Sequence, residues 1–386
     1  MILVSATIEL PPLSIYIHIP WCIRKCPYCD FNSHQAETIP EDAYIDALLE
    51  DLDIDLPQVQ GRNIETIFFG GGTPSLLSAA GLQRLLHGVF TRVTLAKDAE
   101  ITLEANPGTF EQEKFIGYRQ AGINRLSIGV QSFQPEQLVT LGRIHNCDEA
   151  IQAAGMAHTA GFSELNIDLM YGLPNQQPEQ ALADLAQAIA LKPTHLSWYQ
   201  LTIEPNTVFY SKPPKLPEDD ALWDIQEAGQ SYLEEQGYAQ YEISAYAKAG
   251  HECRHNINYW QFGDYLGIGA GAHGKITHGN TQEITRYQKT RVPKDYLNKD
   301  KAFLSHSVNV KKDEIAMEFF MNGLRLNRGV DKQHFLARTL HAEMPAAIQQ
   351  PLTQALKQGL LVEDAQRWVP TELGRQHLNS LLQLFI

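Results

Sequence analysis

Apolar and polar positions in the N-terminal two thirds of the chain alternate between two kinds of segment. Short runs rich in β-branched and aromatic residues predict strands, and longer stretches with apolar residues three and four apart predict amphipathic helices. The predicted strands are Ser14–Ile19, Glu65–Phe69, Ile101–Glu104, Arg125–Val130, Glu164–Leu169 and His195–Leu201, and the helices between them are Pro40–Leu56, Ala79–Val93, Glu111–Ala121, Cys147–Ala160 and Glu179–Leu191. We therefore expect an α/β fold with a parallel sheet, arranged as a full or partial (β/α)6 TIM-like barrel.

The remainder of the chain has a different pattern. A proline-rich connection at Ser211–Pro217 leads to a long predicted helix at Glu218–Gln236, and Tyr238–Gly274 is rich in aromatic residues and glycine. A polar stretch at Pro293–Ser307 is typical of a linker. The C-terminal part predicts three helices, a hairpin around Gly359–Pro370 and a last helix, which indicates a mostly helical, winged-helix-like domain. The predicted domains are a core at 1–236, an aromatic-rich extension at 237–305 and a C-terminal domain at 306–386.

Bulk composition describes a globular protein and excludes several classes. The 386 residues carry a formal net charge of −14, which disfavours a nucleic-acid partner even if the C-terminal domain is a winged helix. Five cysteines, mostly clustered, do not form the framework of a secreted disulfide protein. The first 20 residues predict no targeting segment, and apolar stretches elsewhere are too short to span a bilayer. We expect a cytoplasmic protein without an integral membrane segment.

Three of the five cysteines lie within eight residues, as Cys22-x3-Cys26-x2-Cys29. This spacing places three thiolates on one short loop, where they can bind three irons of a [4Fe–4S] cluster and leave the fourth iron open to another ligand. A zinc loop and a disulfide are the alternatives. Structural zinc requires four closed ligands, and no second cysteine pair lies nearby in the sequence, so the spacing favours the cluster.

Glycines and polar residues follow the predicted strands. Gly70-Gly71-Gly72-Thr73-Pro74 comes after the second strand, where it could let a ligand approach the backbone or simply make a tight turn into a helix. The run matches neither a dinucleotide fingerprint nor a phosphate loop. Polar residues at or after the next strands would suit a zwitterionic ligand with a ribose, although each alone could be a solvated loop residue. They are Glu104, Gln131, Arg143 and Asp168.

These motifs together carry a family resemblance. Tyr16-Ile-His-Ile-Pro20, the cysteine loop, the glycine run, Glu104-Ala-Asn-Pro107 and Gly129-Val-Gln-Ser-Phe133 closely resemble the radical S-adenosylmethionine (SAM) superfamily. Within it they resemble the HemN/HemW branch, which contains oxygen-independent coproporphyrinogen III oxidases and haem chaperones. The similarity runs from about Leu10 to Ile386.

The resemblance implies cofactors and residue roles. Cys22, Cys26 and Cys29 would ligate a [4Fe–4S] cluster whose open iron chelates the methionine part of SAM. Tyr16, Gly71 and Glu104 would contact that SAM, and Tyr28 would flank its adenine. In the oxidases a second SAM is held by groups that match Gly72, Thr73, Gln131, Arg143 and Asp168.

Two departures favour the chaperones over the oxidases. The oxidases have a further cysteine where this chain has Phe31, and a longer segment before the first strand, which here begins at Ser14. The chain instead has His255-Asn256-Ile-Asn-Tyr259-Trp260, which matches the HNxxYW signature of the chaperone branch. A histidine beside aromatic residues could supply an axial ligand and a flat wall for haem. The alternative is an aromatic cluster in the core with His255 as a hydrogen-bonded member.

The sequence therefore predicts a haem chaperone on a radical SAM scaffold. It would bind haem near His255 and deliver it to apo-haemoproteins such as respiratory enzymes, and the resemblance leaves room for a homodimer. The main alternative is an oxygen-independent coproporphyrinogen III oxidase. A radical methyltransferase and a purely structural iron–sulfur protein are further alternatives, so the sequence leaves open whether the protein is an enzyme.

Overall fold

The computed structural model describes residues 10–108 and 111–386. Residues 1–9, which belong to the stretch in which no targeting segment is predicted, lie outside the described residues, as do residues 109–110. Within the described part of the chain, no helix is both long and apolar enough to cross a membrane.

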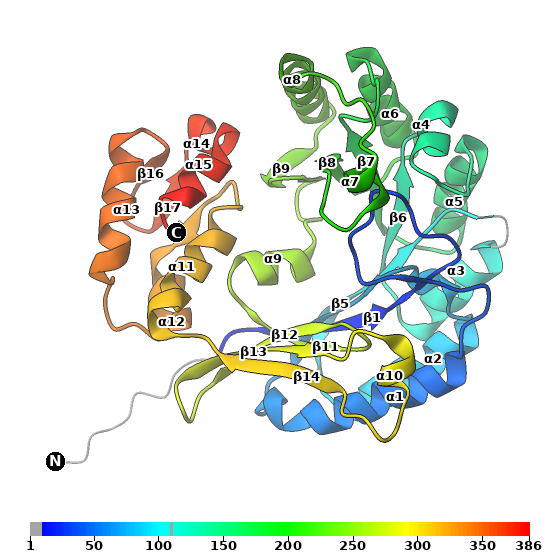
Figure 1. Cartoon of the computed structure of the whole chain (residues 1–386), viewed down its shortest axis with the longest axis horizontal. Helices are drawn as coiled ribbons and strands as arrows, with labels where there is room; N and C mark the ends of the chain where they lie inside the picture. Colours follow the sequence, from blue (N-terminus) through cyan, green and yellow to red (C-terminus); the bar gives the residue numbers. More distant parts are fainter. Residues whose placement is uncertain (1–9, 109–110) are drawn as a thin grey trace.

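A parallel sheet of six strands forms the centre of the fold. Its strands run in the order β1, β4, β5, β6, β7, β8, and each is hydrogen-bonded in parallel to the next. Helices follow the strands and cover the outer face, which confirms the predicted partial (β/α)6 barrel (Figure 1). The strands are β1 (Leu13–Ile19), β4 (Ile64–Gly71), β5 (Leu95–Ala105), β6 (Arg125–Gln131), β7 (Glu164–Tyr171) and β8 (His195–Gln200), and the helices are α1 (Glu41–Asp55), α2 (Ala79–Phe90), α3 (Glu111–Ala121), α4 (Pro135–Thr140), α5 (Cys147–Thr159) and α6 (Pro178–Ala190).

The apolar pattern of the strands explains this arrangement. Every residue of β6 is buried, as expected for a strand covered on both faces. Leu126, Ile128 and Val130 belong to one continuous core that includes side chains from the helices. Each Å2 of apolar surface that is buried stabilises this layer by about 25 cal/mol.

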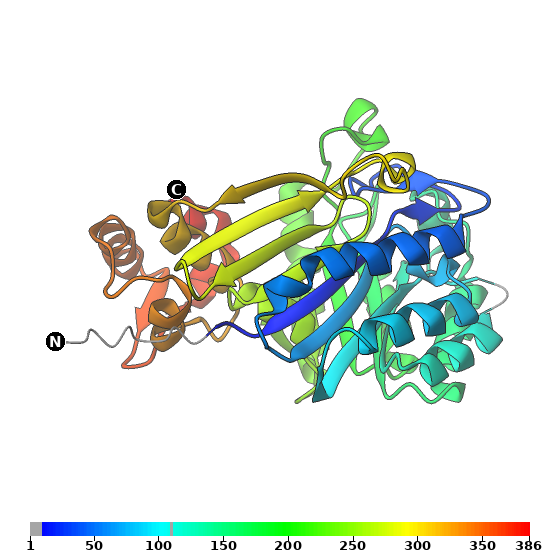
Figure 2. The ribbon, with the colours of Figure 1, turned by 90° about the horizontal axis from the view of Figure 1, so that it is seen from below.

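The sheet continues beyond β1 on the side away from β4, and helix α1 packs against this extension through Asp51 and Asp55, which bind Lys289. Strand β11 (Asp264–Ile268) pairs in parallel with β1, and β12 (His273–His278), β13 (Glu283–Lys289) and β14 (Leu304–Asn309) follow antiparallel (Figure 2). The polar stretch Pro293–Ser307 is therefore not a linker, because it forms α10 (Pro293–Tyr296) and the first part of β14. All of β14 is exposed at the sheet edge, so its sequence needs no apolar alternation. At the other edge lie α7 (Val208–Ser211), α8 (Asp219–Glu235), β9 (Ala239–Glu242) and β10 (Ala245–Ala247).

The C-terminal part is mostly helical and has its own core. Phe319, Phe320, Phe335, Trp368 and Phe385 pack together there, and Phe262 and Ile284 from the β11–β13 region join them. Figure 1 shows this part, in orange and red, beside the barrel. Its elements are α11 (Lys312–Gly323), β15 (Val330–Asp331), α12 (Lys332–Arg338), α13 (Ala346–Lys357), β16 (Leu361–Glu363), β17 (Arg367–Pro370), α14 (Glu372–Gln376) and α15 (Leu378–Gln383).

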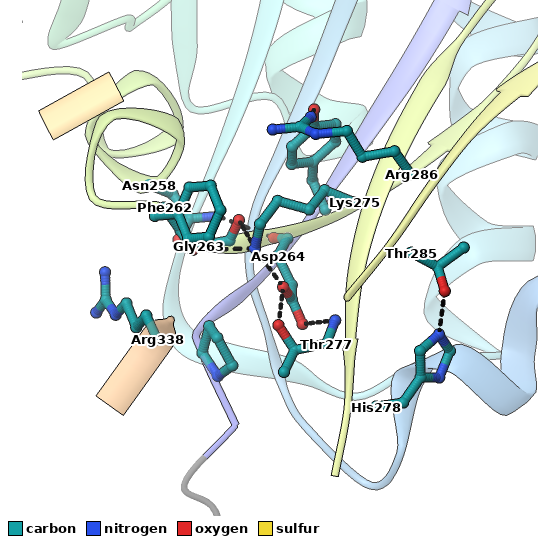
Figure 3. A network of polar contacts seen from close by, with 12 residues as sticks. Asn258, Phe262, Gly263, Asp264, Lys275, Thr277, His278, Thr285, Arg286 and Arg338 are labelled. Atoms are coloured by element: carbon teal, nitrogen blue, oxygen red, sulfur yellow. Dashed lines mark hydrogen bonds and ion pairs between the residues drawn. The ribbon is translucent and has the colours of Figure 1, made fainter. Parts of the chain in front are cut away.

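A buried ionic network fixes the start of β11 (Figure 3). The Asp264 carboxylate accepts hydrogen bonds from Lys275 Nζ at 2.9 Å and from Arg62 Nη1 at 2.7 Å. It also accepts from the backbone N–H of Thr277 at 2.8 Å and from its hydroxyl at 2.9 Å. Because every charge in this network has partners, the desolvation cost of burying it is offset. The network ties β11 to β12 and to the loop before β4.

Candidate functional site

The three cysteines follow β1 and line one cavity of about 560 Å3. The short strands β2 (Trp21–Cys22) and β3 (His34–Gln35) close the base of their loop, and the N–H of Cys29 donates to the carbonyl of Cys26 at 3.2 Å. All three thiols are half-buried and unbridged. Burial raises the pKa of the Cys22 and Cys29 thiols, so ligation to a metal must supply the energy that ionises them.

The donor set fits a cluster better than a single ion. Among the described residues, no three His, Cys, Asp or Glu side chains are close enough to hold one metal ion. In a cubane cluster each thiolate binds a different iron, so the three sulfurs do not need to converge on one point. The cavity beside them also offers room, which a closed zinc site would not require. Cys22, Cys26 and Cys29 can therefore hold three corners of a [4Fe–4S] cluster.

The glycine run packs against the segment that leads into the cysteine loop. The N–H of Gly72 donates to Ile19 O at 2.7 Å, and that of Thr73 donates to Trp21 O at 2.8 Å. A Cβ on Gly72 would lie 2.5 Å from Trp21 O, and Gly71 has a φ of +112°. Glycine is thus required for close packing and for backbone conformation. The run is a tight turn that also forms part of the cavity wall.

A chain of side chains joins this turn to Arg143. Arg143 Nη2 donates to Asn106 Oδ1 at 2.7 Å and also contacts the carbonyl of Gly129. Asn106 Nδ2 in turn donates to Thr73 Oγ1 at 3.0 Å. The Nε of Arg143 is buried without a partner among the described residues, so the guanidinium retains a donor for an anionic ligand. Asn106 therefore orients the Arg143 guanidinium. The sequence does not single it out as a site residue, although it lies in the motif Glu104-Ala-Asn-Pro107.

Two carboxyl groups face the same cavity. Burial, reinforced by the nearby Asp168 carboxylate, raises the pKa of Glu104 to about 8. Asp168 lies in the middle of β7 rather than at its end, and it accepts hydrogen bonds from Ser127 at 2.9 Å and Asn166 at 2.8 Å. Burial raises its pKa too, despite those bonds. Two buried carboxyl groups close together favour the binding of a positively charged ligand, which would stabilise their ionised forms.

Gln131 ends β6 in a left-handed conformation, with a φ of +72°. The Tyr199 hydroxyl donates to its Oε1 at 2.7 Å and fixes the side chain at the cavity wall. A non-glycine residue with positive φ is uncommon and often marks a functional position. Tyr199 is a second cavity residue that the sequence does not single out, because its position depends on the neighbouring strand.

Most of the predicted residues meet at this cavity, which we call the cluster pocket. They are Cys22, Cys26, Tyr28, Cys29, Gly71, Gly72, Thr73, Glu104, Gln131, Arg143 and Asp168. Tyr16 instead lines a neighbouring cavity of about 710 Å3, where its hydroxyl lies 3.1 Å from His18 Nδ1. Phe31, Gly71 and Glu104 border both cavities, so the two adjoin.

His255 lies apart from both cavities, in α9 (Arg254–Trp260). Its side chain is buried, at 1% exposure, with Nδ1 2.6 Å from Thr66 Oγ1 and Nε2 2.8 Å from the Tyr259 hydroxyl. Burial lowers its pKa to about 3, so the ring is neutral. Glu100 anchors the start of α9 by accepting from the N–H groups of Arg254 and His255, both at 3.1 Å. In this conformation both ring nitrogens are engaged, whereas Tyr259 and Trp260 line the 710 Å3 cavity.

Comparisons with known proteins assign the chain to a family. The model of the Radical SAM superfamily matches residues 16–187, and that of the HemN C-terminal domain matches residues 310–377. "Heme chaperone HemW" of Escherichia coli (strain K12) is 54% identical over 380 residues, 98% of this chain and 99% of that protein. "Heme chaperone HemW" of Haemophilus influenzae is also 54% identical, over 383 residues with the same coverage.

A solved structure agrees with the family match. The coproporphyrinogen III oxidase HemN from Escherichia coli, a radical SAM enzyme, superimposes with a TM-score of 0.82 at 25% identity and covers 98% of this chain and 91% of its own. The likeness extends over the barrel, the added strands and the C-terminal part. The chain belongs to the radical SAM superfamily and, within it, to the HemW family.

Proposed function

We propose that this protein is a haem chaperone, which binds haem and passes it to apo-haemoproteins from a scaffold that also holds a [4Fe–4S] cluster and SAM. Full-length similarity to proteins described as haem chaperones supports this function. The structural observation that carries it is the pair of adjoining cavities. One presents cysteines and polar groups suited to the cluster and SAM, and the other is a larger chamber with aromatic walls.

The cluster pocket offers a complementary group for each part of SAM. Glu104 would accept a hydrogen bond from the amino group of SAM, and the unpartnered Nε of Arg143 would donate to a carboxylate. Tyr28 lies at the cavity wall beside Phe209, with ring centroids 6.4 Å apart, where an adenine could stack. When bound, the cluster supplies one electron for chemistry at its open iron. By the resemblance, Gly72, Thr73, Gln131, Arg143 and Asp168 are the candidates for holding a second SAM.

An oxidative decarboxylase is the competing function, because the matched oxidase shares the whole fold. Phe31 argues against it. Its side chain is 62% exposed at the border of the two cavities, at the position where the resemblance places a cysteine in the oxidases. A phenyl ring offers that border an apolar surface and no thiol for proton or hydrogen transfer.

Anaerobic reconstitution followed by two assays on one preparation separates these functions. The chaperone predicts stoichiometric haem binding in the Soret region, followed by transfer to apomyoglobin, used here as a generic acceptor. It also predicts no protoporphyrinogen from coproporphyrinogen III with reductant and SAM. Turnover of coproporphyrinogen III without specific haem binding would overturn the proposal.

The proposal extends to the client proteins, the oligomeric state and the location. Delivery to respiratory enzymes and pairing as a homodimer rest on the family resemblance alone. A cytoplasmic location is favoured by the need to keep the cysteines reduced for cluster binding. Size-exclusion chromatography of the protein with and without haem would decide between monomer and dimer.

A further inference from the structure

The 710 Å3 cavity has the composition of a tetrapyrrole site, and this inference rests on the proposed function. Its volume lies within the range of about 300–1,000 Å3 that is usual for cofactor and ligand sites. Aromatic side chains from β1, the cysteine loop, α9, β11 and the turn between α9 and β11 line it. They are Tyr16, Phe31, Tyr259, Trp260, Phe262 and Tyr265. A flat apolar macrocycle is the class of ligand that such walls bind.

The register of β12 and β13 places basic side chains along one face of this cavity. Lys275 pairs with Arg286 across the two strands, and His273 pairs with Gln288 two residues further along. All four line the cavity, because residues two apart on a strand share a face. The residues of the opposite face, including His278 and Thr285, line a separate cavity of about 340 Å3.

Most of the cations around the cavity already have partners. Lys275 is committed to Asp264, as Figure 3 shows, and lies over the Phe262 ring at 4.1 Å. Arg286 donates to Glu318 Oε2 from Nε at 2.8 Å and Nη2 at 2.7 Å. Arg291 is different, because its guanidinium has no ion pair or hydrogen bond among residues 10–108 and 111–386. Its backbone is nevertheless fixed, since Arg291 O accepts from Asn32 Nδ2 at 2.9 Å.

His273 is the histidine of this cavity whose ring has no hydrogen-bond partner in the described part of the chain. His18 also lines the cavity, but Tyr16 and Asn32 O engage its two nitrogens at 3.1 Å and 2.8 Å. Partial burial, with the charges of Arg291 and Arg286, lowers the pKa of His273. A neutral, unpartnered imidazole is the form that binds haem iron.

We propose that this cavity is the haem site, with His273 as the axial ligand to iron and Arg291 as the ion-pair partner of a haem propionate. The aromatic walls hold the macrocycle between α9 and the β12–β13 face, while the arginine fixes its orientation. His255, sealed behind Tyr259, then shapes the wall of the site and does not bind iron. The assignment places the haem beside the cluster pocket, across the border formed by Phe31, Gly71 and Glu104.

The test is haem titration of the full-length, cluster-loaded protein, with absorbance and resonance Raman spectra of the complex. We expect His273→Ala to weaken haem binding about tenfold or more and to lose the nitrogen-ligated spectrum, which added imidazole restores. Metal-free protoporphyrin IX should bind this variant and the wild type equally, because it needs no axial ligand. His278→Ala is the matched control, since it lies on the same strand with its side chain on the opposite face, and it should behave as wild type.

Arg291→Gln tests the propionate contact separately. It should weaken haem and protoporphyrin IX binding about fivefold or more but leave haem dimethyl ester unaffected, because the ester has no carboxylate. A wild-type spectrum and affinity in His273→Ala would overturn the assignment, as would loss of iron ligation in His255→Phe with His273 intact. Absence of haem binding by the wild-type protein would instead reject the proposed function, and the assignment with it.

Discussion

The hydroxyl oxygen of Thr66, in the interior of β4, lies 2.6 Å from Nδ1 of His255 in α9. The same oxygen donates to Ser14 Oγ at 2.8 Å, so the imidazole is the donor in its bond to Thr66. The other ring nitrogen then accepts from the Tyr259 hydroxyl. This chain of bonds fastens the aromatic helix α9 to the two central strands β1 and β4.

We therefore expect His255→Ala to destabilise the fold by about 2–4 kcal/mol, because it leaves the Tyr259 hydroxyl without its acceptor and opens a cavity beside Phe68. Urea denaturation with a global probe measures this change. The double variant Thr66→Val with His255→Phe removes both partners of the bond and should recover part of the loss. Unchanged stability in His255→Ala, together with loss of haem, would indicate that His255 is itself a ligand.

Glu104, as the proposed partner of SAM, should make SAM binding dependent on pH. With its pKa near 8, the free carboxyl is mostly protonated at pH 6, whereas the positively charged SAM is bound best by the carboxylate. The affinity should consequently rise about tenfold per pH unit from pH 6 and level off above pH 8. Calorimetric titration of cluster-loaded protein measures this slope, and Glu104→Gln should bind weakly with no slope. A flat profile in the wild type would contradict the assignment.

Gly72→Ala tests the contact between the glycine run and the cysteine loop. The added methyl group would meet Trp21 O at 2.5 Å, so the two segments must move apart. We expect the variant to assemble less cluster, as measured by iron content and visible absorption after reconstitution. Gly155→Ala is the matched control: its Cβ would meet no atom within 4 Å, inside helix α5, so alanine should leave the iron content unchanged and stabilise the helix by about 0.5–1 kcal/mol.

The buried Asp264 network predicts a loss of stability in acid. Although burial opposes it, the charges of Lys275 and Arg62 hold the pKa of Asp264 below its ordinary value. Its stabilisation is thus fully present above the unfolded-chain pKa of about 3.9 and is lost as the pH falls through the lower folded pKa. Asp264→Asn should cost about 3–5 kcal/mol at pH 7 and less at pH 3, by urea denaturation at each pH.

The control for this prediction is an ion pair near the surface. Lys301 and Asp295 lie 2.8 Å apart with side chains that are 49% and 37% exposed, so Lys301→Met should change the free energy of unfolding by at most about 1 kcal/mol at either pH. An equal effect of the two substitutions would show that burial does not govern the Asp264 network.

The barrel could be predicted from the sequence because its strands are short apolar runs, which can be recognised without knowing what they pack against. The gathering of Cys22, Cys26 and Cys29 at one cavity could be predicted for a similar reason, since their spacing alone brings three thiols together. The edge strand β14 could not, because an exposed strand at the rim of a sheet carries polar residues like a linker.

The 710 Å3 cavity could not be predicted from the sequence either. Its wall depends on the pairing of His273 with Gln288 and on the position of α9, which are set by contacts between distant segments. The HNxxYW segment directs attention to His255, but its hydrogen bonds to Thr66 and Tyr259 appear only when β4 and α9 are packed together. His273 lies outside that signature and has no neighbouring residue that marks it.

The border shared by the two cavities has a thermodynamic consequence. Glu104 and Gly71 belong to both, so a sulfonium ligand that ionises Glu104 replaces a neutral acid with an anion in the wall of the haem chamber. The two ligands then do not bind independently. By linkage, if binding of SAM changes the affinity for haem by some factor, binding of haem changes the affinity for SAM by the same factor. Loading of the cargo and occupation of the cluster pocket are thus one coupled equilibrium, and either can report on the other.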